Sequence, residues 1–324
     1  MKWMKMLLGA FVSLASCCGF AQPSVAAFPD QPVRIVVGFP PGGGADIVAR
    51  IYGEKLGQIW NQPVIIENRA GAAGVIATDY VARADPDGYT LLMDTLGIRS
   101  VNPLLYSMKT DPNRDLTPVS EITAVSFLLV VNPALPVHSV EELIALAKRK
   151  PNQINYSSSG LGGGPHLAAA LFDQMAGVEL MHIPFKGSGP SYSALLANQV
   201  SVTFDSVLQG LPYVRSGKLR ALAVLGKKRS DLLPSVPTME EAGGKGYDFT
   251  NWFGLSAPAG TPKAVIDRLN EAVRQAQADP GLRDRLEKMG AEVTVTTPEQ
   301  YAALIRAENA KWAKVIEEAG IRAE

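Results

Sequence analysis

Cysteine, histidine and net charge are all scarce in this chain. Its 324 residues include two cysteines and three histidines, and 31 basic residues balance 31 acidic ones. A zinc or iron–sulfur site needs more such side chains at ligand spacing, so we predict no metal. Because no overall field attracts nucleic acid or an anionic membrane surface, we expect neither as a partner. Any function must be built mainly from backbone groups, hydroxyls and a few charges.

The N-terminal segment predicts export. A basic start is followed by an apolar stretch from Met6 to Ala21, and Val25-Ala26-Ala27 places small residues at a cleavage site. We therefore predict a signal peptide over residues 1–27, a mature chain that begins at Phe28, and a periplasmic location. An alternative stays open, because Leu14-Ala15-Ser16-Cys17 resembles a lipobox in which Cys17 would be acylated. Both cysteines lie in this leader, so simple cleavage leaves a mature chain without disulfides.

The mature chain alternates short strand patterns with helical patterns, which is typical of α/β folds with parallel sheets. We expect two lobes, each a mainly parallel sheet flanked by helices. Lobe 1 comprises residues 28–126 and 251–324, lobe 2 comprises residues 127–250, and ordinary segments near Ser126 and Asn251 join them. The strands expected are 33–37, 64–67, 89–93, 127–131, 154–156, 180–183, 200–204, 219–225 and 293–295, with helices over 45–56, 71–84 and 298–319 and further helices starting near 139, 165, 189 and 262.

A glycine-rich motif occurs twice, 120 positions apart. The first copy contains Gly42-Gly43-Gly44, one further residue and Asp46; the second contains Gly162-Gly163-Gly164, one further residue and His166. Each copy reads as a strand, a turn and the start of an apolar helix. Glycine lets the main chain approach a ligand closely, and the first turn of a helix offers unpaired N–H groups with a partial positive charge. Such a helix start binds anions readily.

Two such turns, one in each lobe, fit a ligand bound in a crevice at the carboxyl ends of the strands. We therefore predict that neutral donors of both lobes hold a small carboxylate. Either turn alone is equally compatible with a structural role, since glycine-rich turns are common in α/β folds; Asp46 favours helix capping, and His166 could contact the ligand. We expect no nucleotide or other cofactor, because the first turn lacks Gly-Lys-Ser/Thr and the spacing of a dinucleotide fingerprint.

Other candidates lie at the same expected edge. Lys186 and Gly187 follow one strand and Asp205 ends another, although Lys186 also fits a solvated charge and Asp205 a helix cap. Arg99 follows the strand 89–93 through Thr95. If Arg99 turns inward, it could pair a distal carboxylate of the ligand in a bidentate manner, whereas exposed arginines are commoner.

No catalytic signature is recognisable. Ser157-Ser158-Ser159-Gly160 is not a Gly-x-Ser-x-Gly nucleophile elbow, and no histidine stands in a known catalytic motif. We therefore predict no catalytic residue and no enzyme activity.

Several motifs together resemble the solute-binding proteins of tripartite tricarboxylate transporters, also called the Bug family. The likeness covers essentially the whole mature chain. Its motifs are Val33-Arg34-Ile35-Val36-Val37-Gly38-Phe39-Pro40-Pro41-Gly42-Gly43-Gly44-Ala45-Asp46, Glu67-Asn68-Arg69-Ala70-Gly71, Asp85-Pro86-Asp87-Gly88-Tyr89, Asn102-Pro103-Leu104-Leu105-Tyr106, Pro184-Phe185-Lys186-Gly187 and Pro234-Ser235-Val236-Pro237-Thr238.

The resemblance implies a two-lobed periplasmic binding protein of the Venus-flytrap type that delivers a carboxylate to the permease subunits of its transporter. The family often has tyrosine where Phe185 stands, and a small polar residue or histidine near Arg99. A hydroxyl contact is therefore in doubt here, and Arg99 either selects a dicarboxylate or is exposed. The binding residues carried over are Phe39, Pro40, Gly43, Gly44 and Asp46 in lobe 1 and Ser158, Ser159, Gly160, Gly162 and His166 in lobe 2.

Three functions follow in order of preference. The first is a monomeric receptor for an organic di- or tricarboxylate, an aromatic acid or an acidic amino acid. The second is a periplasmic sensor that presents its ligand-bound form to a signalling receptor. The third is an exported hydrolase or isomerase.

Overall fold

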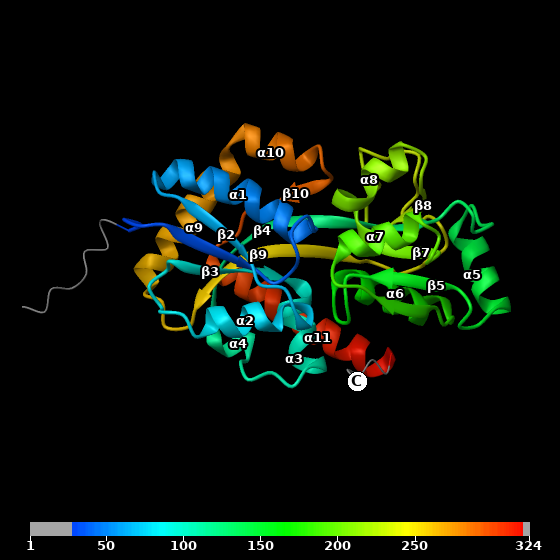
Figure 1. Ribbon diagram of the computed structural model, residues 1–324, viewed down its shortest axis with the longest axis horizontal. Helices are drawn as coiled ribbons and strands as arrows, with labels where there is room; N and C mark the ends of the chain where they lie inside the picture. Colours follow the sequence, from blue (N-terminus) through cyan, green and yellow to red (C-terminus); the bar gives the residue numbers. More distant parts are fainter. Residues whose placement is uncertain (1–27, 320–324) are drawn as a thin grey trace, which may run out of the picture.

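The computed structural model describes residues 28–319 and shows an elongated molecule of two lobes (Figure 1). The predicted leader, including Cys17, lies outside the described residues. Within residues 28–319, no helix is both long and apolar enough to cross a membrane. The α/β fold and the two-lobed architecture agree with the sequence-based prediction.

Ten strands form the framework, in the order β2-β1-β3-β9-β4-β7-β5-β6, with β8 and β10 also paired to β4. The outer pairs β1–β2, β1–β3, β5–β6 and β5–β7 are parallel, as predicted. All pairs that involve β4 or β9 are antiparallel, so the centre of the molecule departs from the parallel pattern. The strands are β1 (Val33–Val37), β2 (Val64–Asn68), β3 (Thr90–Thr95), β4 (Leu116–Val131), β5 (Asn155–Ser158), β6 (Met181–Pro184), β7 (Val202–Ser206), β8 (Arg220–Val224), β9 (Thr250–Pro258) and β10 (Ala291–Val293).

The long strand β4 passes from one lobe to the other (Figure 1). It pairs with β9 as far as Ser126, which lies opposite Thr250. From Phe127, opposite Ser206, it pairs with β7 instead. Two antiparallel neighbours, β4 and β9, therefore carry the chain across the junction. The sequence did not predict the first part of β4 or any of β9, because Pro118, Glu121 and several hydroxyl residues interrupt the apolar pattern.

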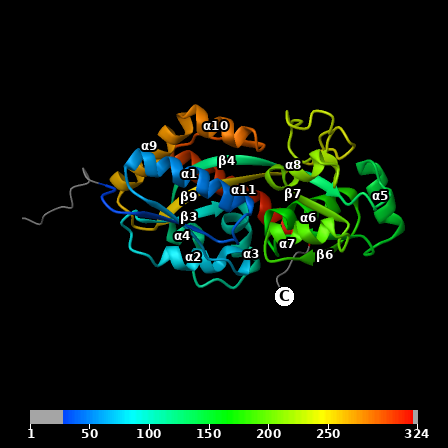
Figure 2. The ribbon, with the colours of Figure 1, turned by 45° about the horizontal axis from the view of Figure 1, so that its top comes forward.

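Helices cover both faces of the lobe 1 sheet: α1, α9 and α10 on one side and α2, α3 and α4 on the other (Figure 2). In lobe 2, α5 lies at the end distant from lobe 1 (Figure 2). The helices are α1 (Gly44–Trp60), α2 (Val75–Ala82), α3 (Asn102–Leu105), α4 (Pro112–Asp115), α5 (Val140–Arg149), α6 (Gly164–Ala176), α7 (Ser188–Leu196), α8 (Val207–Arg215), α9 (Lys263–Ala278), α10 (Pro280–Glu287) and α11 (Pro298–Ala319), with the short turns η2 (Ala72–Gly74) and η3 (Gly97–Val101).

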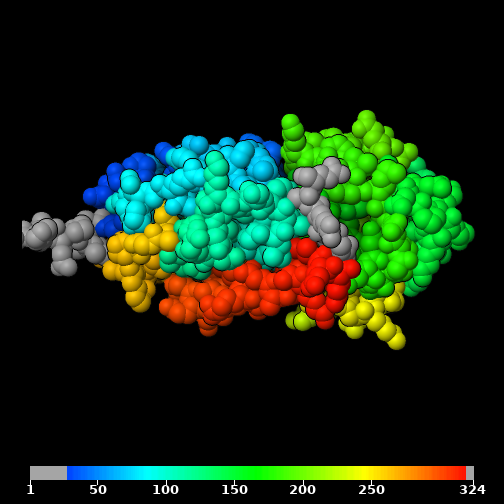
Figure 3. Space-filling model, turned by 90° about the horizontal axis from the view of Figure 1, so that it is seen from below, coloured from blue at the N-terminus to red at the C-terminus, as the bar shows by residue number. Residues whose placement is uncertain are grey.

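The C-terminal helix α11 is a third connection between the lobes. It starts on lobe 1 and extends along the underside of the molecule to lobe 2 (Figure 3). Trp312 is fully buried and packs edge-on against Phe249, with ring centroids 5.7 Å apart. Gln174 of α6 donates a hydrogen bond to Glu318 at 2.8 Å. The C-terminal end of α11 therefore packs against Phe249 and α6.

Candidate functional site

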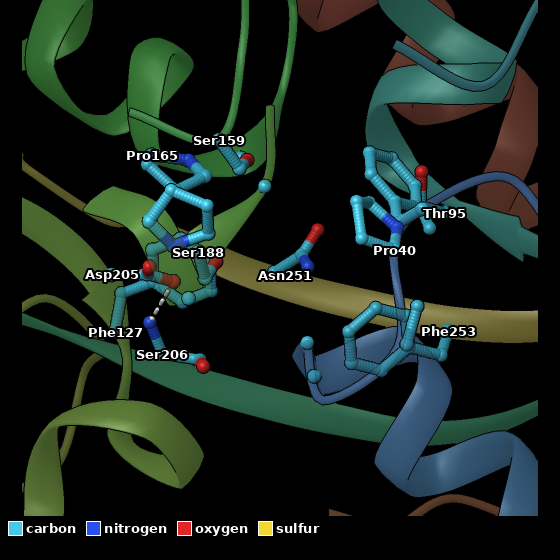
Figure 4. A pocket seen from close by; sticks show the side chains of 18 of the residues that line it. Pro40, Thr95, Phe127, Ser159, Pro165, Ser188, Asp205, Ser206, Asn251 and Phe253 are labelled. Atoms are coloured by element: carbon cyan, nitrogen blue, oxygen red, sulfur yellow. Dashed lines mark hydrogen bonds between the residues drawn. The ribbon is translucent and has the colours of Figure 1, made fainter. Parts of the chain in front are cut away.

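A pocket lies between the two lobes, where the carboxyl ends of β1, β3, β5 and β7 meet (Figure 4). It encloses about 640 Å³ not occupied by atoms, part of it open to solvent. This position is the one at which open α/β sheets bind ligands. The lining residues are Phe39, Pro40, Pro41, Gly43, Gly44, Ala45, Thr95, Asn251 and Phe253 from lobe 1, and Phe127, Ser159, Gly164, Pro165, Gly187, Ser188, Gly189, Pro190, Asp205 and Ser206 from lobe 2.

Four helices begin at this pocket. The first residues of α1, α6 and α7 line it, and so does Ser206, which precedes α8. None of the four has a side chain that caps its N-terminus, whereas Ser139 caps α5 and Asp279 caps α10. Uncapped helix starts keep N–H donors and a partial positive charge available. Their convergence makes the pocket a site for an anion.

The two glycine turns have matching geometry. Gly42 and Gly162 both have positive φ, 84° and 77°, which a residue with a side chain rarely adopts. The Gly42 N–H donates to Asp46 at 2.9 Å, and the Gly162 N–H donates to Nδ1 of His166 at 3.2 Å. The residue four positions on therefore fixes each turn. In this way Asp46 and His166 support the turns from behind rather than lining the pocket.

The carboxylate of Asp46 accepts hydrogen bonds from three residues, Gly42, Arg50 and Asn68. Arg50 donates to both of its carboxylate oxygens, and Asn68 donates to Oδ1 at 2.9 Å. Burial acts to raise the pKa of Asp46, but the hydrogen bonds from Arg50, Gly42 and Asn68 outweigh it, so the pKa is lowered. Asp46 therefore stays ionised and keeps the first turn in place.

His166 belongs to a stack of aromatic rings beneath the second turn. The ring centroids of His166 and His182 lie 4.4 Å apart, and those of His182 and Tyr156 lie 4.9 Å apart. Both pairs of rings are stacked. Nε2 of His182 and the Ser158 hydroxyl are 2.6 Å apart, and Ser158 also accepts from the Gly160 N–H. Burial lowers the pKa of His166 to about 3 and that of His182 to about 4. Both rings are therefore neutral at pH 7.

Asp205 is the only ionisable side chain among the lining residues. It is the penultimate residue of β7 and is 3% exposed, and its Oδ1 accepts the Ser206 N–H at 2.7 Å. Burial raises its pKa to about 6, against the lowering effects of the Ser206 N–H and the Ser188 hydroxyl. Among residues 28–319, no lysine, arginine or histidine lines the pocket. The groups that the pocket offers to a negative ligand are therefore helix starts, hydroxyls and the Asn251 amide rather than a fixed positive charge.

Arg99 requires a correction, because it does not turn toward the cleft. Its side chain is 1% exposed, and its Nε donates to Asp94 at 2.9 Å while Nη2 donates to the Ser256 hydroxyl at 2.6 Å. A third hydrogen bond goes to the carbonyl of Pro112. The sequence could not reveal this partner, because Ser256 lies on β9, which only the tertiary fold places beside β3.

The structure divides the remaining candidates. It places Phe39, Pro40, Gly43, Gly44, Thr95, Ser159, Gly187 and Asp205 at the pocket. Ser158, Gly160 and Gly162 lie in or beside the second turn without lining the pocket, and Lys186 is exposed outside it. Phe127, Asn251 and Phe253 were not among the candidates, since they come from the crossing strands β4 and β9. Ser206 was also missed, and its adjacency to Asp205 was the available signal.

Comparisons with known proteins agree over nearly the full length. The sequence model described as the tripartite tricarboxylate transporter family receptor matches residues 48–321. Protein BugT of Bordetella pertussis is 36% identical over 98% of this chain and 97% of its own.

Solved structures lead to the same family. Rpa4515 of R. palustris, solved with adipate, is 38% identical, with a TM-score of 0.89 over 92% of this chain and 100% of its own. MatC from Rhodopseudomonas palustris, solved with bound malate, is 33% identical, with a TM-score of 0.85 over 89% of this chain and 100% of its own. The periplasmic binding protein BugD is 33% identical, with a TM-score of 0.84 over 92% of this chain and 100% of its own. The chain therefore belongs to the tripartite tricarboxylate transporter receptor family, as a Bug-type solute-binding protein.

Proposed function

We propose that this protein captures a small organic carboxylate between its lobes in the periplasm and delivers it to the permease subunits of a tripartite tricarboxylate transporter. The observation that carries the proposal is the convergence of four uncapped helix starts, from α1, α6, α7 and α8, on one pocket without a basic side chain. The adipate and malate bound by two relatives support the choice of a carboxylate.

The two lobes act as a clamp. Lobe 1 comprises residues 28–126 and 251–324, lobe 2 comprises residues 127–250, and the chain crosses between them in β4, β9 and α11. Both lobes supply hydrogen-bond donors for the ligand. Binding therefore stabilises the closed arrangement relative to an open one by the free energy of the contacts that form only on closure. A closed, loaded form differs in shape from an empty one, which is what a permease needs to recognise.

Catalysis has less support from the same pocket. Its hydroxyls, on Thr95, Ser159, Ser188 and Ser206, have no imidazole beside them among the lining residues. The close Ser158–His182 pair lies outside the pocket, and Ser158 is fully buried. An activated nucleophile must reach its substrate, so this pair is better explained as support for the second turn.

A thermal-shift screen tests the binding function. The mature chain is heated with di- and tricarboxylates, aromatic acids and acidic amino acids at millimolar concentration. A ligand present at about 100 times its Kd adds roughly 2.7 kcal/mol to the free energy of unfolding, so a true ligand raises Tm by several degrees. If none of the acids shifts Tm, the proposal fails.

A second measurement tests delivery. Deletion of the gene should abolish uptake of the radiolabelled acid, and uptake should return with the wild-type gene. Unchanged uptake together with loss of a transcriptional response to the acid would assign the clamp to a signalling receptor. Recovery of the acid in chemically altered form after incubation would assign it to an enzyme.

A further inference from the structure

Two buried oxygen atoms at the pocket lack hydrogen-bond partners. Oδ2 of Asp205 and Oδ1 of Asn251 are both inaccessible to solvent and neither accepts a hydrogen bond within residues 28–319. Both residues line the pocket, Asp205 from the lobe 2 wall and Asn251 from β9 between the lobes (Figure 4). A buried acceptor without a donor is unfavourable, so native proteins rarely leave one unsatisfied without a reason.

Donors on the protein do not meet Oδ2 of Asp205 directly. The backbone donor of Ser206 is already used by Oδ1. The Ser188 hydroxyl acts as a hydrogen-bond donor that lowers the pKa of Asp205, and the Tyr192 hydroxyl, itself without a hydrogen-bond partner, interacts electrostatically with the carboxylate. Neither hydroxyl has hydrogen-bond geometry to Oδ2. Asp205 and Asn251 thus place unpartnered acceptors at a pocket whose other polar groups are mainly N–H and hydroxyl groups.

We propose that Asp205 determines specificity by accepting a hydrogen bond from the ligand, so that the pocket selects organic acids that carry a hydroxyl or ammonium donor in addition to a carboxylate. This inference rests on the proposed function and deepens it. The carboxylate of the ligand lies among the helix starts, and its donor group meets Oδ2 of Asp205. An acid that lacks the donor leaves this oxygen unsatisfied, and one that places a second carboxylate there is also repelled.

A site built to hydrogen-bond a ligand group rejects the analogue without that group much more strongly than an apolar pocket does. The Asn251 oxygen, which is also unpartnered on a lining residue, offers a second acceptor for such a donor. The expected preference is therefore at least tenfold for the donor-bearing member of a matched pair.

Matched acids separate this inference from the proposed function. Isothermal titration calorimetry compares malate with succinate and 2-hydroxyglutarate with glutarate, each pair differing by one hydroxyl, and adds aspartate to test an ammonium donor. We expect at least one donor-bearing acid to bind the wild type at least tenfold more tightly than its partner. Equal affinity within every pair, or tighter binding of the acids without the donor, overturns the inference and leaves the proposed function intact. Absence of binding by every acid overturns both.

Two variants locate the effect. Asp205→Asn preserves size but removes the charge, and it should bring the affinities within a pair to within about threefold by weakening the donor-bearing acid. Asp173→Asn is the matched control, because Asp173 is another Asp with one oxygen on a backbone N–H and the other unpartnered, but it lies outside the pocket. In Asp173→Asn, the ratio of affinities within each pair of acids should equal that of the wild type. A wild-type ratio that Asp205→Asn leaves unchanged overturns the assignment to Asp205; should this variant not fold, Asp205→Ser is measured in the same way, with the same outcomes.

Discussion

The side-chain amide of Gln209 in lobe 2 donates a hydrogen bond of 2.7 Å to the carbonyl of Gly42 in lobe 1. On the opposite lobe, the Tyr106 hydroxyl donates to the carbonyl of Leu161 at 2.8 Å. Each bond ties a side chain of one lobe to the glycine turn of the other. Close packing accompanies them, since a methyl group at Gly97 would lie 2.6 Å from the carbonyl oxygen of Gly162. The lobes are therefore in contact on both sides of the pocket.

These two bonds should stabilise the closed clamp. Gln209→Met and Tyr106→Phe each remove one cross-lobe hydrogen bond with a net value of about 0.5–1.5 kcal/mol, so each should weaken binding of any acid found in the thermal-shift screen by roughly two- to tenfold. Different acids should be affected equally, because neither residue lines the pocket. Calorimetry measures the affinities, and small-angle scattering should show a larger radius of gyration for the double variant without ligand. Tyr213→Phe removes a hydroxyl within lobe 2 and serves as the control. It should change neither the affinity nor the radius of gyration.

Gly44 offers a test of where the ligand lies. An added methyl group would stand 3.4 Å from Phe253, 3.6 Å from the Ser206 hydroxyl and 3.7 Å from Leu208, which is ordinary contact, so Gly44→Ala should fold with unchanged or slightly raised Tm. The same methyl group occupies space at the start of α1 and should weaken binding about tenfold. The control is Glu54→Ala, on the exposed side of the same helix. Full affinity in Gly44→Ala would show that the ligand does not approach this helix start.

The outer parts of the fold could be predicted from sequence because their patterns are local. The strand over 33–37 and the helix over 298–319 have the predicted bounds, since the local apolar pattern of each segment is clear. The crossing strands could not be predicted in this way. Gly254 and Asn251 interrupt the pattern of β9, and its register against β3 and β4 depends on contacts far away in sequence.

The candidate site, too, could be predicted only where its residues depend on local sequence patterns. The glycine turns, Thr95 and Asp205 follow strands, so their place at the pocket could be inferred from the order of elements. The environment of Arg99 could not, because an arginine after a strand fits a ligand site, a surface or a buried ion pair equally well. Only the tertiary contact with Asp94 and Ser256 decides between these.

The Arg99–Asp94 pair should support stability rather than binding. Arg99→Met leaves the carboxylate of Asp94 buried without its counter-charge, which costs about 3–5 kcal/mol and should lower Tm by several degrees. The double variant Arg99→Met with Asp94→Asn should recover part of the loss, because no unpaired charge remains. The folded fraction of either variant should bind acids with wild-type affinity. A selective loss of dicarboxylate binding at unchanged Tm would return Arg99 to the ligand site.

The neutral histidines beneath the second turn predict a specific pH dependence. In the unfolded chain a histidine titrates near 6.5, whereas burial lowers the pKa to about 3 for His166 and about 4 for His182. The unfolded state therefore binds more protons below pH 6.5, and the stability that the rings contribute at pH 7 is lost as the pH falls from about 6.5 toward 4. Buried carboxyls act in the opposite sense: the pKa values of Glu121 and Asp173 are raised to about 7 and that of Asp205 to about 6, so these groups add stability over part of the same range.

A variant separates the two opposing contributions. His166→Asn keeps an acceptor for the Gly162 N–H but cannot take up a proton. Urea denaturation of wild type and variant is measured between pH 8 and pH 4. The difference in unfolding free energy should be constant above pH 7 and should move in favour of the variant by roughly 1 kcal/mol or more at pH 4.5, because only the wild type must keep His166 neutral there. The carboxyls contribute equally to both proteins and cancel in the difference. A difference that stays flat down to pH 4 would mean that His166 is solvated and charged in the folded protein, and the stacked support of the second turn would then be wrong.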